Sequence, residues 1–242
     1  MHADRIAELL EPFLRRTGDG STGDQRLTTN DLTNISTYID LLLRWNARIN
    51  LTAIRNEEEI VTRHFGESLF TARHLFPARQ CKRESPRSCS LIDVGSGAGF
   101  PGLPIKLWTP DLALTLIESL QKKATFLREA ARQLTLTDIN VFSGRAENYP
   151  GPVAEVVTLR AVERFDTTLP IAARLVAPSG RIALLIGKSQ LASAHTLTPQ
   201  YSWAPPIAIP LSSSRVLAVG ILNPQPGLTT RTKKVKSGTA SG

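Results

Sequence analysis

The fold of this chain is decided by one stretch, Leu91-Ile92-Asp93-Val94-Gly95-Ser96-Gly97-Ala98-Gly99-Phe100-Pro101-Gly102. A short apolar run ends in an aspartate, and four glycines then fall within eight residues. Pro101 follows, and proline is favoured in the first turn of a helix because its missing N–H would have no partner there. The stretch predicts a strand, a glycine turn and a helix. In such a turn, bare backbone N–H groups at the helix start can face a ligand.

Two ligand-binding patterns fit this glycine turn. Gly97-x-Gly99-x-x-Gly102 matches the dinucleotide fingerprint, whereas Gly95-x-Gly97-x-Gly99 after Asp93 matches the S-adenosylmethionine loop of methyltransferases. The fingerprint has to begin directly after the strand, and the first glycine after this strand is Gly95. The methyltransferase pattern is therefore favoured, and a nicotinamide-dependent oxidoreductase is the alternative enzyme class.

The composition is ordinary for a soluble protein: the chain has 242 residues, of which 41% are hydrophobic. A chain of this length can bury a substantial core, and no apolar run approaches the ~18 residues of a membrane span. Asp4 and Arg5 stand where a signal peptide would place its apolar region. We therefore expect a cytoplasmic protein with no membrane partner, and a monomer.

Neither the cysteines nor the histidines indicate a metal. Cys81 and Cys89 are too few for a zinc site, and we expect both to be reduced. The four histidines show no metal-ligand spacing. The formal net charge of +8 favours a nucleic-acid partner over mere solubility, although part of this charge sits in the tail at 231–236.

The N-terminal part predicts three helices. The first covers 4–16, and the second follows at helical spacing from Leu32 to Ile49, with Asn30 or Asp31 able to cap its start.

The third helix covers about 57–75 and places Arg63 and Glu67 one turn apart, with His64 beside them. On periodicity alone, Arg63 and Glu67 are interpreted as a surface ion pair worth only ~0.3–0.5 kcal/mol.

From Leu91 onward, strand and helix patterns alternate. We expect strands at 91–94, 112–117, 139–142, 154–159 and 181–186, and helices near Pro101, at 120–134 and at 163–176. Two late strands, near 202–209 and 215–221, lack a helix between them and are expected to form a hairpin. The alternation predicts an α/β fold with a mostly parallel sheet and helices on both faces.

These patterns divide the chain into four parts. Residues 1–76 are a helical extension, 77–90 a polar linker, and 91–222 a Rossmann-like domain. The Pro, Gly, Ser, Thr and Lys content of 223–242 predicts a disordered basic tail.

Ligands of such sheets bind beyond the carboxyl ends of the strands, where we expect Asp93, Glu118, Ala146, Glu147 and Arg160. Glu118 follows Gly95 by 23 residues, and a carboxylate there can accept hydrogen bonds from both ribose hydroxyls of an adenosine cofactor. It can alternatively cap the next helix. Glu147 can receive the adenine amino group, with the Ala146 backbone beside it.

Several motifs together carry a family resemblance. They are Asn50-Leu51-Thr52, Arg63-His64-Phe65-Gly66-Glu67-Ser68, the glycine stretch from Asp93 to Gly102, Glu118-Ser119-Leu120-Gln121-Lys122-Lys123, Arg145-Ala146-Glu147 and Arg160-Ala161. In this order they resemble the bacterial small-subunit ribosomal RNA guanine-N7 methyltransferases, also known as glucose-inhibited division protein B. The resemblance runs from about residue 30 to 222, and the glycine loop with its trailing Phe-Pro-Gly is its most specific part.

The resemblance implies a class I methyltransferase fold that uses S-adenosylmethionine to methylate a guanine in 16S ribosomal RNA. Five residues match cofactor-contact positions of that family: Gly95, Phe100, Ala146, Glu147 and Arg160. We expect Gly97 at this cofactor site as well, because it belongs to the glycine pattern. We also expect Glu118 there, because its carboxylate can accept hydrogen bonds from the ribose hydroxyls. The chain departs from the family pattern with Glu67 in place of Asp and Gln121 in place of Gly. The resemblance also favours a site role for Arg63, His64 and Glu67 over the surface pair.

The chain lacks the devices that other RNA methylations need. Methylation at pyrimidine C5 requires a thiolate, and neither cysteine lies near a strand end. Methylation of an exocyclic amine typically uses an Asn/Asp-Pro-Pro-aromatic loop, where this chain reads Leu159-Arg160-Ala161-Val162. Guanine N7 already has a free lone pair, so catalysis reduces to alignment, worth up to ~7–11 kcal/mol. We therefore expect no general base, and Arg160 as a group that orients cofactor or guanine.

The target guanine has to leave its stack to reach such a crevice. Candidates for phosphate contact are Lys122, Lys123, Arg63, Arg73 and the basic tail. Two alternatives stay open besides the oxidoreductase: a non-catalytic RNA-binding protein with a relic cofactor fold, and methylation of a different RNA atom.

Overall fold

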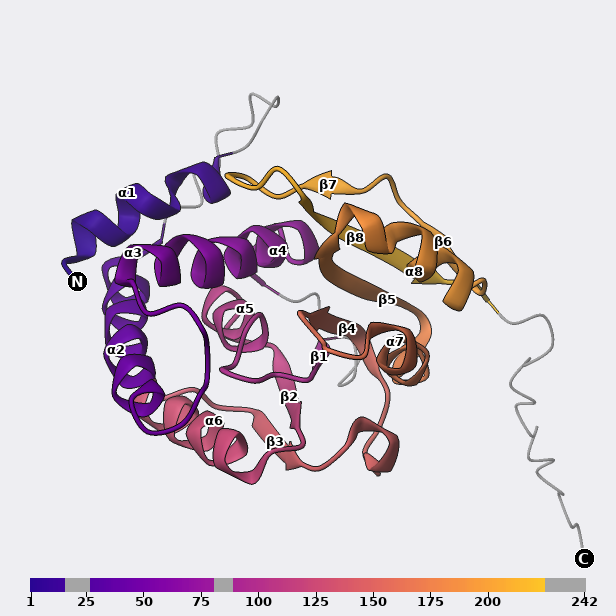
Figure 1. Ribbon diagram of the computed structural model, residues 1–242, viewed down its shortest axis with the longest axis horizontal. Helices are drawn as coiled ribbons and strands as arrows, with labels where there is room; N and C mark the ends of the chain where they lie inside the picture. Colours follow the sequence, from indigo (N-terminus) through magenta and orange to yellow (C-terminus); the bar gives the residue numbers. More distant parts are fainter. Residues whose placement is uncertain (16–26, 81–88, 225–242) are drawn as a thin grey trace, which may run out of the picture.

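The computed structural model describes residues 1–15, 27–80 and 89–224, and its centre is a twisted β-sheet (Figure 1). The strands run in the order β3-β2-β1-β4-β5-β8-β6, with β7 paired to β8. Their bounds are β1 Ser90–Val94, β2 Ala113–Glu118, β3 Ile139–Ser143, β4 Ala154–Arg160, β5 Val176–Gly187, β6 Tyr201–Trp203, β7 Ile207–Ala208 and β8 Arg215–Leu222. Strands β1 to β5 pair in parallel, whereas β6, β7 and β5 all pair antiparallel with β8.

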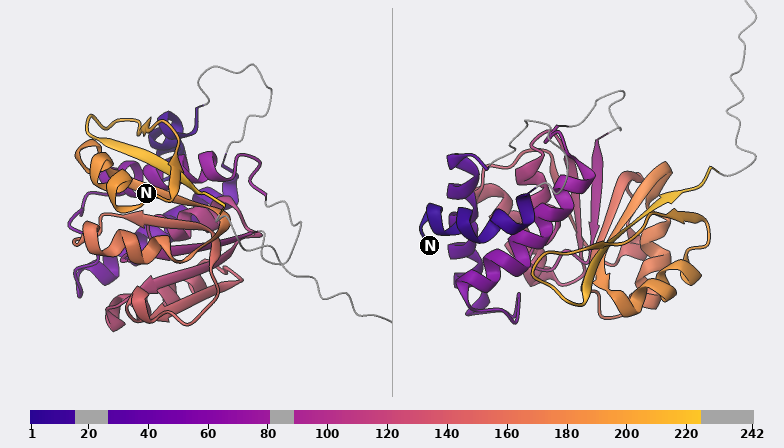
Figure 2. Two further views of the ribbon diagram at one scale, coloured as in Figure 1. Left: turned by 90° about the vertical axis from the view of Figure 1, so that its right-hand side faces the viewer. Right: turned by 90° about the horizontal axis from the view of Figure 1, so that it is seen from above.

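Helices cover both faces of this sheet, as Figure 2 shows from above. On one face lie α1 Ala3–Leu14, α2 Thr29–Asn46, α3 Glu57–Glu59, α4 Glu67–Leu75, α5 Gly102–Trp108 and α6 Gln121–Gln133. On the other lie α7 Phe165–Ala173 and α8 Leu191–Leu197. Crossovers from one parallel strand to the next bring successive β-strand carboxyl ends to one edge. The expected α/β fold with a mostly parallel sheet is confirmed.

The N-terminal helices and the sheet share one apolar core. Ile6, Tyr38 and Phe65 belong to the same buried cluster as Trp108 of α5 and Phe126 of α6. The Trp108 indole donates a hydrogen bond to the Phe76 carbonyl at 2.9 Å. Burial of large apolar and aromatic side chains stabilises by roughly 1.5–3 kcal/mol each, so this shared core holds the first helices firmly against the sheet.

Helix α2 begins at Thr29, ahead of both expected caps. Thr28 is its N-cap, and the Thr28 hydroxyl accepts from the Asp31 N–H at 3.1 Å while the Asp31 carboxylate accepts from the Thr28 N–H at 2.8 Å. Asp31 therefore closes a capping box from inside the helix instead of capping it. Asn30, the other expected cap, lies inside the helix too.

The third helix contains a π-helical segment, η1, at Ile60–Gly66, between α3 and α4. A π-helix closes its hydrogen bonds over five residues, so residues four apart no longer lie one above the other. As a result, Arg63 is exposed whereas Glu67 is only 2% exposed. The expected surface ion pair between Arg63 and Glu67 is therefore wrong, because Glu67 pairs with Arg160 and Arg215 instead.

Other expectations differ from the structure at element ends. The helix expected from residue 120 begins at Gln121, and Leu120 is its N-cap residue, 57% exposed. β5 begins at Val176, five residues early, and the short helix α8 was not expected. The late strands do pair antiparallel with each other, through β8.

Several expectations concern residues that the structure does not describe or properties of the chain as a whole. Cys89 is disulfide-bonded, so the expectation that it is reduced is wrong, and Cys81 lies outside the described residues. Most of the linker 77–90 and the tail from residue 225 also lie outside the described residues. None of the helices in the described part of the chain combines the length and the apolar character that a membrane span needs. Within the same ranges, no group of three or more His, Cys, Asp or Glu side chains is placed to hold a metal.

Candidate active site

A cavity of about 780 Å³ lies beyond the carboxyl ends of β1, β2 and β4. Its walls come from the glycine loop after β1, from the ends of β2 and β4, and from the short 3-10 turn η2, Ala146–Asn148. All seven residues expected at the cofactor site line it: Gly95, Gly97, Phe100, Glu118, Ala146, Glu147 and Arg160. The ends of three parallel strands thus bring residues that are distant in the sequence to one cavity.

The glycine loop is held by the strand beside it. The Gly95 N–H donates to the Ile117 carbonyl at 2.9 Å. Gly97 has φ +55°, and a Cβ there would meet only the Gly95 carbonyl oxygen, at 3.8 Å. Because the backbone at Gly97 lines the cavity without a side chain, a ligand can approach it closely.

Asp93 does not line the cavity, contrary to the strand-end expectation. It is 1% exposed beneath the loop, where Oδ1 accepts from the Thr158 hydroxyl at 2.7 Å and Oδ2 from the Gly102 N–H at 3.3 Å. Burial raises the pKa of this carboxyl to about 6, against the opposing effect of these hydrogen bonds. Asp93 therefore joins the end of β1 to β4 and to the start of α5.

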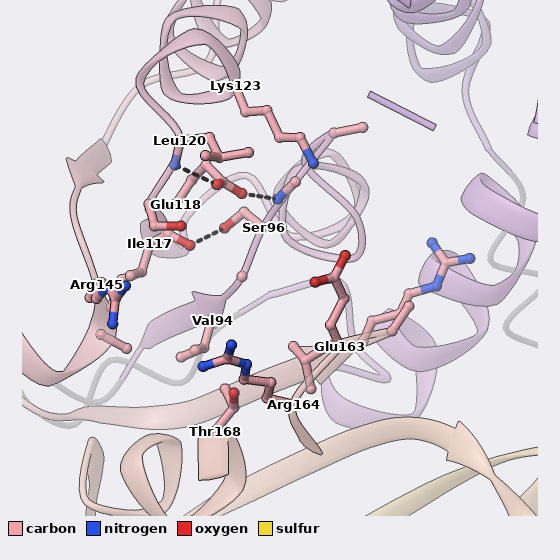
Figure 3. Close-up of a pocket in the computed structure, with 18 of the residues that line it drawn as sticks. Val94, Ser96, Ile117, Glu118, Leu120, Lys123, Arg145, Glu163, Arg164 and Thr168 are labelled. Atoms are coloured by element: carbon pink, nitrogen blue, oxygen red, sulfur yellow. Dashed lines mark hydrogen bonds between the residues drawn. The ribbon is translucent and has the colours of Figure 1, made fainter. Parts of the chain in front are cut away.

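Glu118 connects the glycine loop to the start of α6. Its Oε2 accepts from the Gly97 N–H at 2.9 Å and its Oε1 from the Leu120 N–H at 2.8 Å, as the dashed lines in Figure 3 mark. Leu120 is the N-cap residue of α6, so the alternative capping role is present in part. A carboxylate has about four acceptor sites, and two of those of Glu118 are left for a ligand.

The opposite side of the cavity is polar and charged. Arg145 is the N-cap residue of the η2 turn and Glu147 lies within the turn, and both are exposed. Glu163 and Arg164 follow β4 and project toward the same space, while Lys123 of α6 reaches toward it from the other wall (Figure 3). The cavity is thus lined by charged side chains of both signs, by apolar side chains and by the glycine backbone.

Phe100 stacks with two rings of the N-terminal helices. Tyr38 stacks on one face, with 5.3 Å between ring centroids and 7° between planes. His64 also stacks on the Phe100 ring, with 4.7 Å between ring centroids and 16° between planes. The Tyr38 hydroxyl also donates to the Ala98 carbonyl at 2.5 Å. Phe100 is only 6% exposed, so residues before the sheet hold this end of the glycine loop.

Arg160 is tied into a buried polar network at the end of β4. Its guanidinium donates to the Arg63 carbonyl at 2.6 Å, to His64 Nδ1 at 3.1 Å and to the Glu67 carboxylate at 3.3 Å. Glu67 also pairs with Arg215 at the start of β8. Burial raises the pKa of Glu67, although both arginines oppose this, and burial followed by the Arg160 charge lowers the pKa of His64 to about 3.

The expected phosphate-contact residues take different places. Lys123 lines the cavity and Arg63 lines a neighbouring one, whereas Lys122 is exposed and lines neither. Arg73 is away from the site, because its guanidinium donates to the Leu14 and Arg15 carbonyls at the end of α1.

A second cavity of about 530 Å³ adjoins the first. Five residues line both cavities: Thr52, His64, Arg160, Ala161 and Val162. The rest of its lining includes apolar side chains such as Leu159, Phe165 and Ile186. The site therefore has two compartments separated by one shared wall.

Sequence reasoning missed the roles of three residues: Thr52 lies in the shared wall, Arg215 lines the second cavity, and Tyr38 lines neither cavity. Arg215 carries no motif, and its pairing with Glu67 depends on β8 lying antiparallel beside β5. Tyr38 sits in an amphipathic helix and looks like ordinary core. Thr52 belongs to the quoted Asn-Leu-Thr motif, but nothing in its local pattern indicated a cavity.

Comparison with known proteins gives this site a family. A family model described as GidB, rRNA small subunit methyltransferase G, matches residues 31–207. A ribosomal RNA small subunit methyltransferase G from Chloroflexus aggregans is 37% identical over 205 residues, which cover 80% of this chain and 82% of that protein. The protein of the same name from Myxococcus xanthus is 40% identical over 153 residues, covering 62% and 66%. The chain belongs to the rRNA small subunit methyltransferase G family.

Solved structures agree with this family at the level of fold. A SAM dependent methyltransferase from Aquifex aeolicus superposes with a TM-score of 0.51 over 64% of this chain and 91% of that one, at 13% sequence identity. As a member of the methyltransferase G family, the chain is a methyltransferase that uses S-adenosylmethionine. The expected enzyme class and cofactor are confirmed, and the nicotinamide-dependent alternative is not supported.

The residues present suit this cofactor. The first cavity exposes glycine backbone beside a carboxylate with spare acceptor sites, which fits a nucleoside with ribose hydroxyls.

Proposed function

We propose that this chain transfers the methyl group of S-adenosylmethionine to N7 of a guanine in 16S ribosomal RNA. We further propose that Gly95, Gly97, Phe100, Glu118, Ala146, Glu147 and Arg160 hold the cofactor in the first cavity. The cofactor supplies an electrophilic methyl group. The names of the relatives, which are ribosomal RNA small subunit methyltransferases, support the RNA target.

The state of His64 in the shared wall supports guanine N7 as the nucleophile, because N7 can attack without first losing a proton. The wall between the two cavities has His64 as its titratable base, and both of its ring nitrogens are engaged, with Arg160 and with Thr52. Its pKa, lowered to about 3 by burial and by the Arg160 charge, makes it a weak proton acceptor. Arg160 is a cation. Guanine N7 fits such a wall, because its lone pair is free before the reaction.

The rate of methyl transfer then depends on how the chain positions the base relative to the methyl group. The chain holds a flipped base against the wall and aligns N7 with the methyl group, and close alignment of this kind lowers barriers by up to ~7–11 kcal/mol. Exposed cations at the cavities, Arg63, Arg145 and Arg164, are suited to contact the RNA phosphates on either side of the base. We propose that the protein acts in the cytoplasm as a monomer.

The decisive experiment is to map the methylated nucleotide in 16S rRNA from cells with and without this protein. Loss of one N7-methylguanosine in the deletion strain is the expected result, and an unchanged methylation map would contradict the proposal. Methyl transfer to rRNA by the purified protein would rule out a non-catalytic RNA-binding protein. A methyl group on another atom would redirect the proposal within RNA methyltransferases.

Calorimetry with S-adenosylhomocysteine tests the cofactor site separately. We expect binding to the wild-type protein, much weaker binding to Arg160→Ala, and unchanged binding to the control Arg181→Ala. Arg181 pairs with Glu155 away from both cavities. Undiminished affinity and methyl transfer in Arg160→Ala would remove Arg160 from the site.

A further inference from the structure

Thr52 lies in the wall between the two cavities and is held there by its own backbone. The Asn46 carboxamide binds the Thr52 N–H through Oδ1 at 3.1 Å and the Thr52 carbonyl through Nδ2 at 3.0 Å. Asn46 is itself only 6% exposed. Because a buried amide fixes both backbone groups of Thr52, its side chain has a defined place where the two compartments meet.

The hydrogen bonds of Arg160 fix the tautomer of His64. A guanidinium has donors and no acceptor, so His64 Nδ1, 3.1 Å from Arg160, has to accept. With a pKa of about 3, the ring is neutral near pH 7 and carries its proton on Nε2. His64 Nε2 therefore donates to the Thr52 hydroxyl oxygen, 2.8 Å away.

The Thr52 hydroxyl is then left as a donor. Its oxygen accepts from His64 Nε2 and also from the Ile54 N–H at 3.1 Å, which uses both of its lone pairs. Among the described residues, no acceptor takes the Thr52 hydroxyl proton. Thr52 is half-buried and lines both cavities, so a ligand at the wall meets a hydroxyl that can only donate.

We propose that the second cavity receives the target base and that the Thr52 hydroxyl donates a hydrogen bond to its O6, which selects guanine over adenine. This inference rests on the proposed function. In guanine, O6 and N7 are neighbouring acceptors on one edge of the base, so a base whose N7 faces the cofactor cavity presents O6 to the shared wall. Adenine has an amino donor in place of O6, and it would face a second donor in Thr52.

The test compares two bases in two proteins. Small-subunit rRNA carries either guanine or 2-aminopurine, which keeps N7 but lacks O6, at the mapped target position. For the wild-type protein we expect kcat/KM to be about threefold to tenfold lower with 2-aminopurine, the range for one neutral hydrogen bond. Thr52→Val should abolish this difference. Thr52→Ser, which keeps the hydroxyl, should preserve it.

Because each ratio is measured within a single protein, a general loss of activity or stability in Thr52→Val does not move it. Equal rates on both bases in the wild-type protein would overturn the proposal, and so would a ratio that survives in Thr52→Val. Failure of the wild-type protein to methylate guanine N7 at all would instead contradict the proposed function. S-adenosylhomocysteine binding by calorimetry confirms that each variant keeps its cofactor site.

Discussion

The ring of Tyr38 in α2 stacks nearly parallel on the ring of Phe100 in the glycine loop, with centroids 5.3 Å apart. The same tyrosine closes the contact with a hydrogen bond from its hydroxyl to the Ala98 carbonyl. Tyr38 is fully buried. Tyr38 therefore supports the wall of the cofactor cavity from behind, through Phe100, without lining the cavity itself.

This contact can be separated into its two components. Tyr38→Phe removes the hydrogen bond and leaves the Ala98 carbonyl without this partner, so we expect a loss of about 1–3 kcal/mol in the free energy of unfolding. Tyr38→Ala also removes the stacked ring and should cost about 3–5 kcal/mol. Urea denaturation measures both. Equal losses in the two variants would mean that the ring contributes nothing.

Two loop glycines should respond differently to alanine. Gly99 has φ +87°, and a Cβ there would collide with the Tyr38 hydroxyl and lie 2.6 Å from Leu103 Cδ1. Gly97→Ala meets no such obstacle, and its φ of +55° costs roughly 1–2 kcal/mol. We expect Gly99→Ala to lower the melting temperature clearly more than Gly97→Ala, whereas Gly97→Ala should weaken S-adenosylhomocysteine binding in a folded protein. Unaltered affinity in Gly97→Ala would exclude close approach of the cofactor there.

The buried carboxylate of Glu67 should be essential for stability. Its side chain is 3% exposed between Arg160, 9% exposed, and Arg215, 25% exposed. Glu67→Gln leaves both cations without their counter-ion, which typically costs about 3–5 kcal/mol.

A matched control is Glu155→Gln, whose pair with Arg181 is 28–36% exposed and should be worth at most about 1 kcal/mol. Urea denaturation compares the two variants. Similar small losses in both would show that the Glu67 network is not a stabilising element.

The pH dependence of stability should carry the signature of His64. Its pKa is about 3 in the folded protein and 6.5 in a model peptide, so between these values the unfolded chain binds the proton more tightly. Stability from this group is present above pH 6.5 and is lost as the pH falls toward 3, by about 1.4 kcal/mol per pH unit. His64→Asn should remove this slope in urea titrations. A slope unchanged in the variant would contradict a neutral, buried His64.

Asp93 should affect the pH dependence of stability in the direction opposite to that of His64. Its pKa is about 6 in the folded protein against a model value of 3.8, so the folded state binds the proton more tightly. The contribution of this group to stability therefore falls as the pH rises from 3.8 to 6. Asp93→Asn should steepen the rise of stability with pH over that window, measured in the same titrations. If the rise is no steeper, the Asp93 carboxyl has an ordinary pKa.

The order of strands and helices was predictable because it depends on periodicity and on turn residues. The glycine loop, the parallel strands and the convergence of Glu118, Ala146 and Arg160 on one cavity all follow from where strands end. The sequence could not show that Arg160 is engaged by Glu67 and His64, because these contacts join residues more than 90 positions apart.

Local geometry explains the remaining errors. The π-helical segment Ile60–Gly66 precedes Glu67 and changes the direction of its side chain. No residue type in this segment predicts a π-helix instead of an α-helix. Asp93 was expected in the crevice, but its short side chain bonds to Thr158 of the neighbouring strand and to the first residue of α5. The depth of such a residue depends on its neighbours in space.

The stacking of Tyr38 and His64 on Phe100 has a consequence for genetics. Because Tyr38 and His64 both stack on that ring, loss-of-function substitutions in this gene should be scattered through the first seventy-five or so codons as well as the glycine loop. Many would inactivate the enzyme without altering any atom that touches its methyl donor.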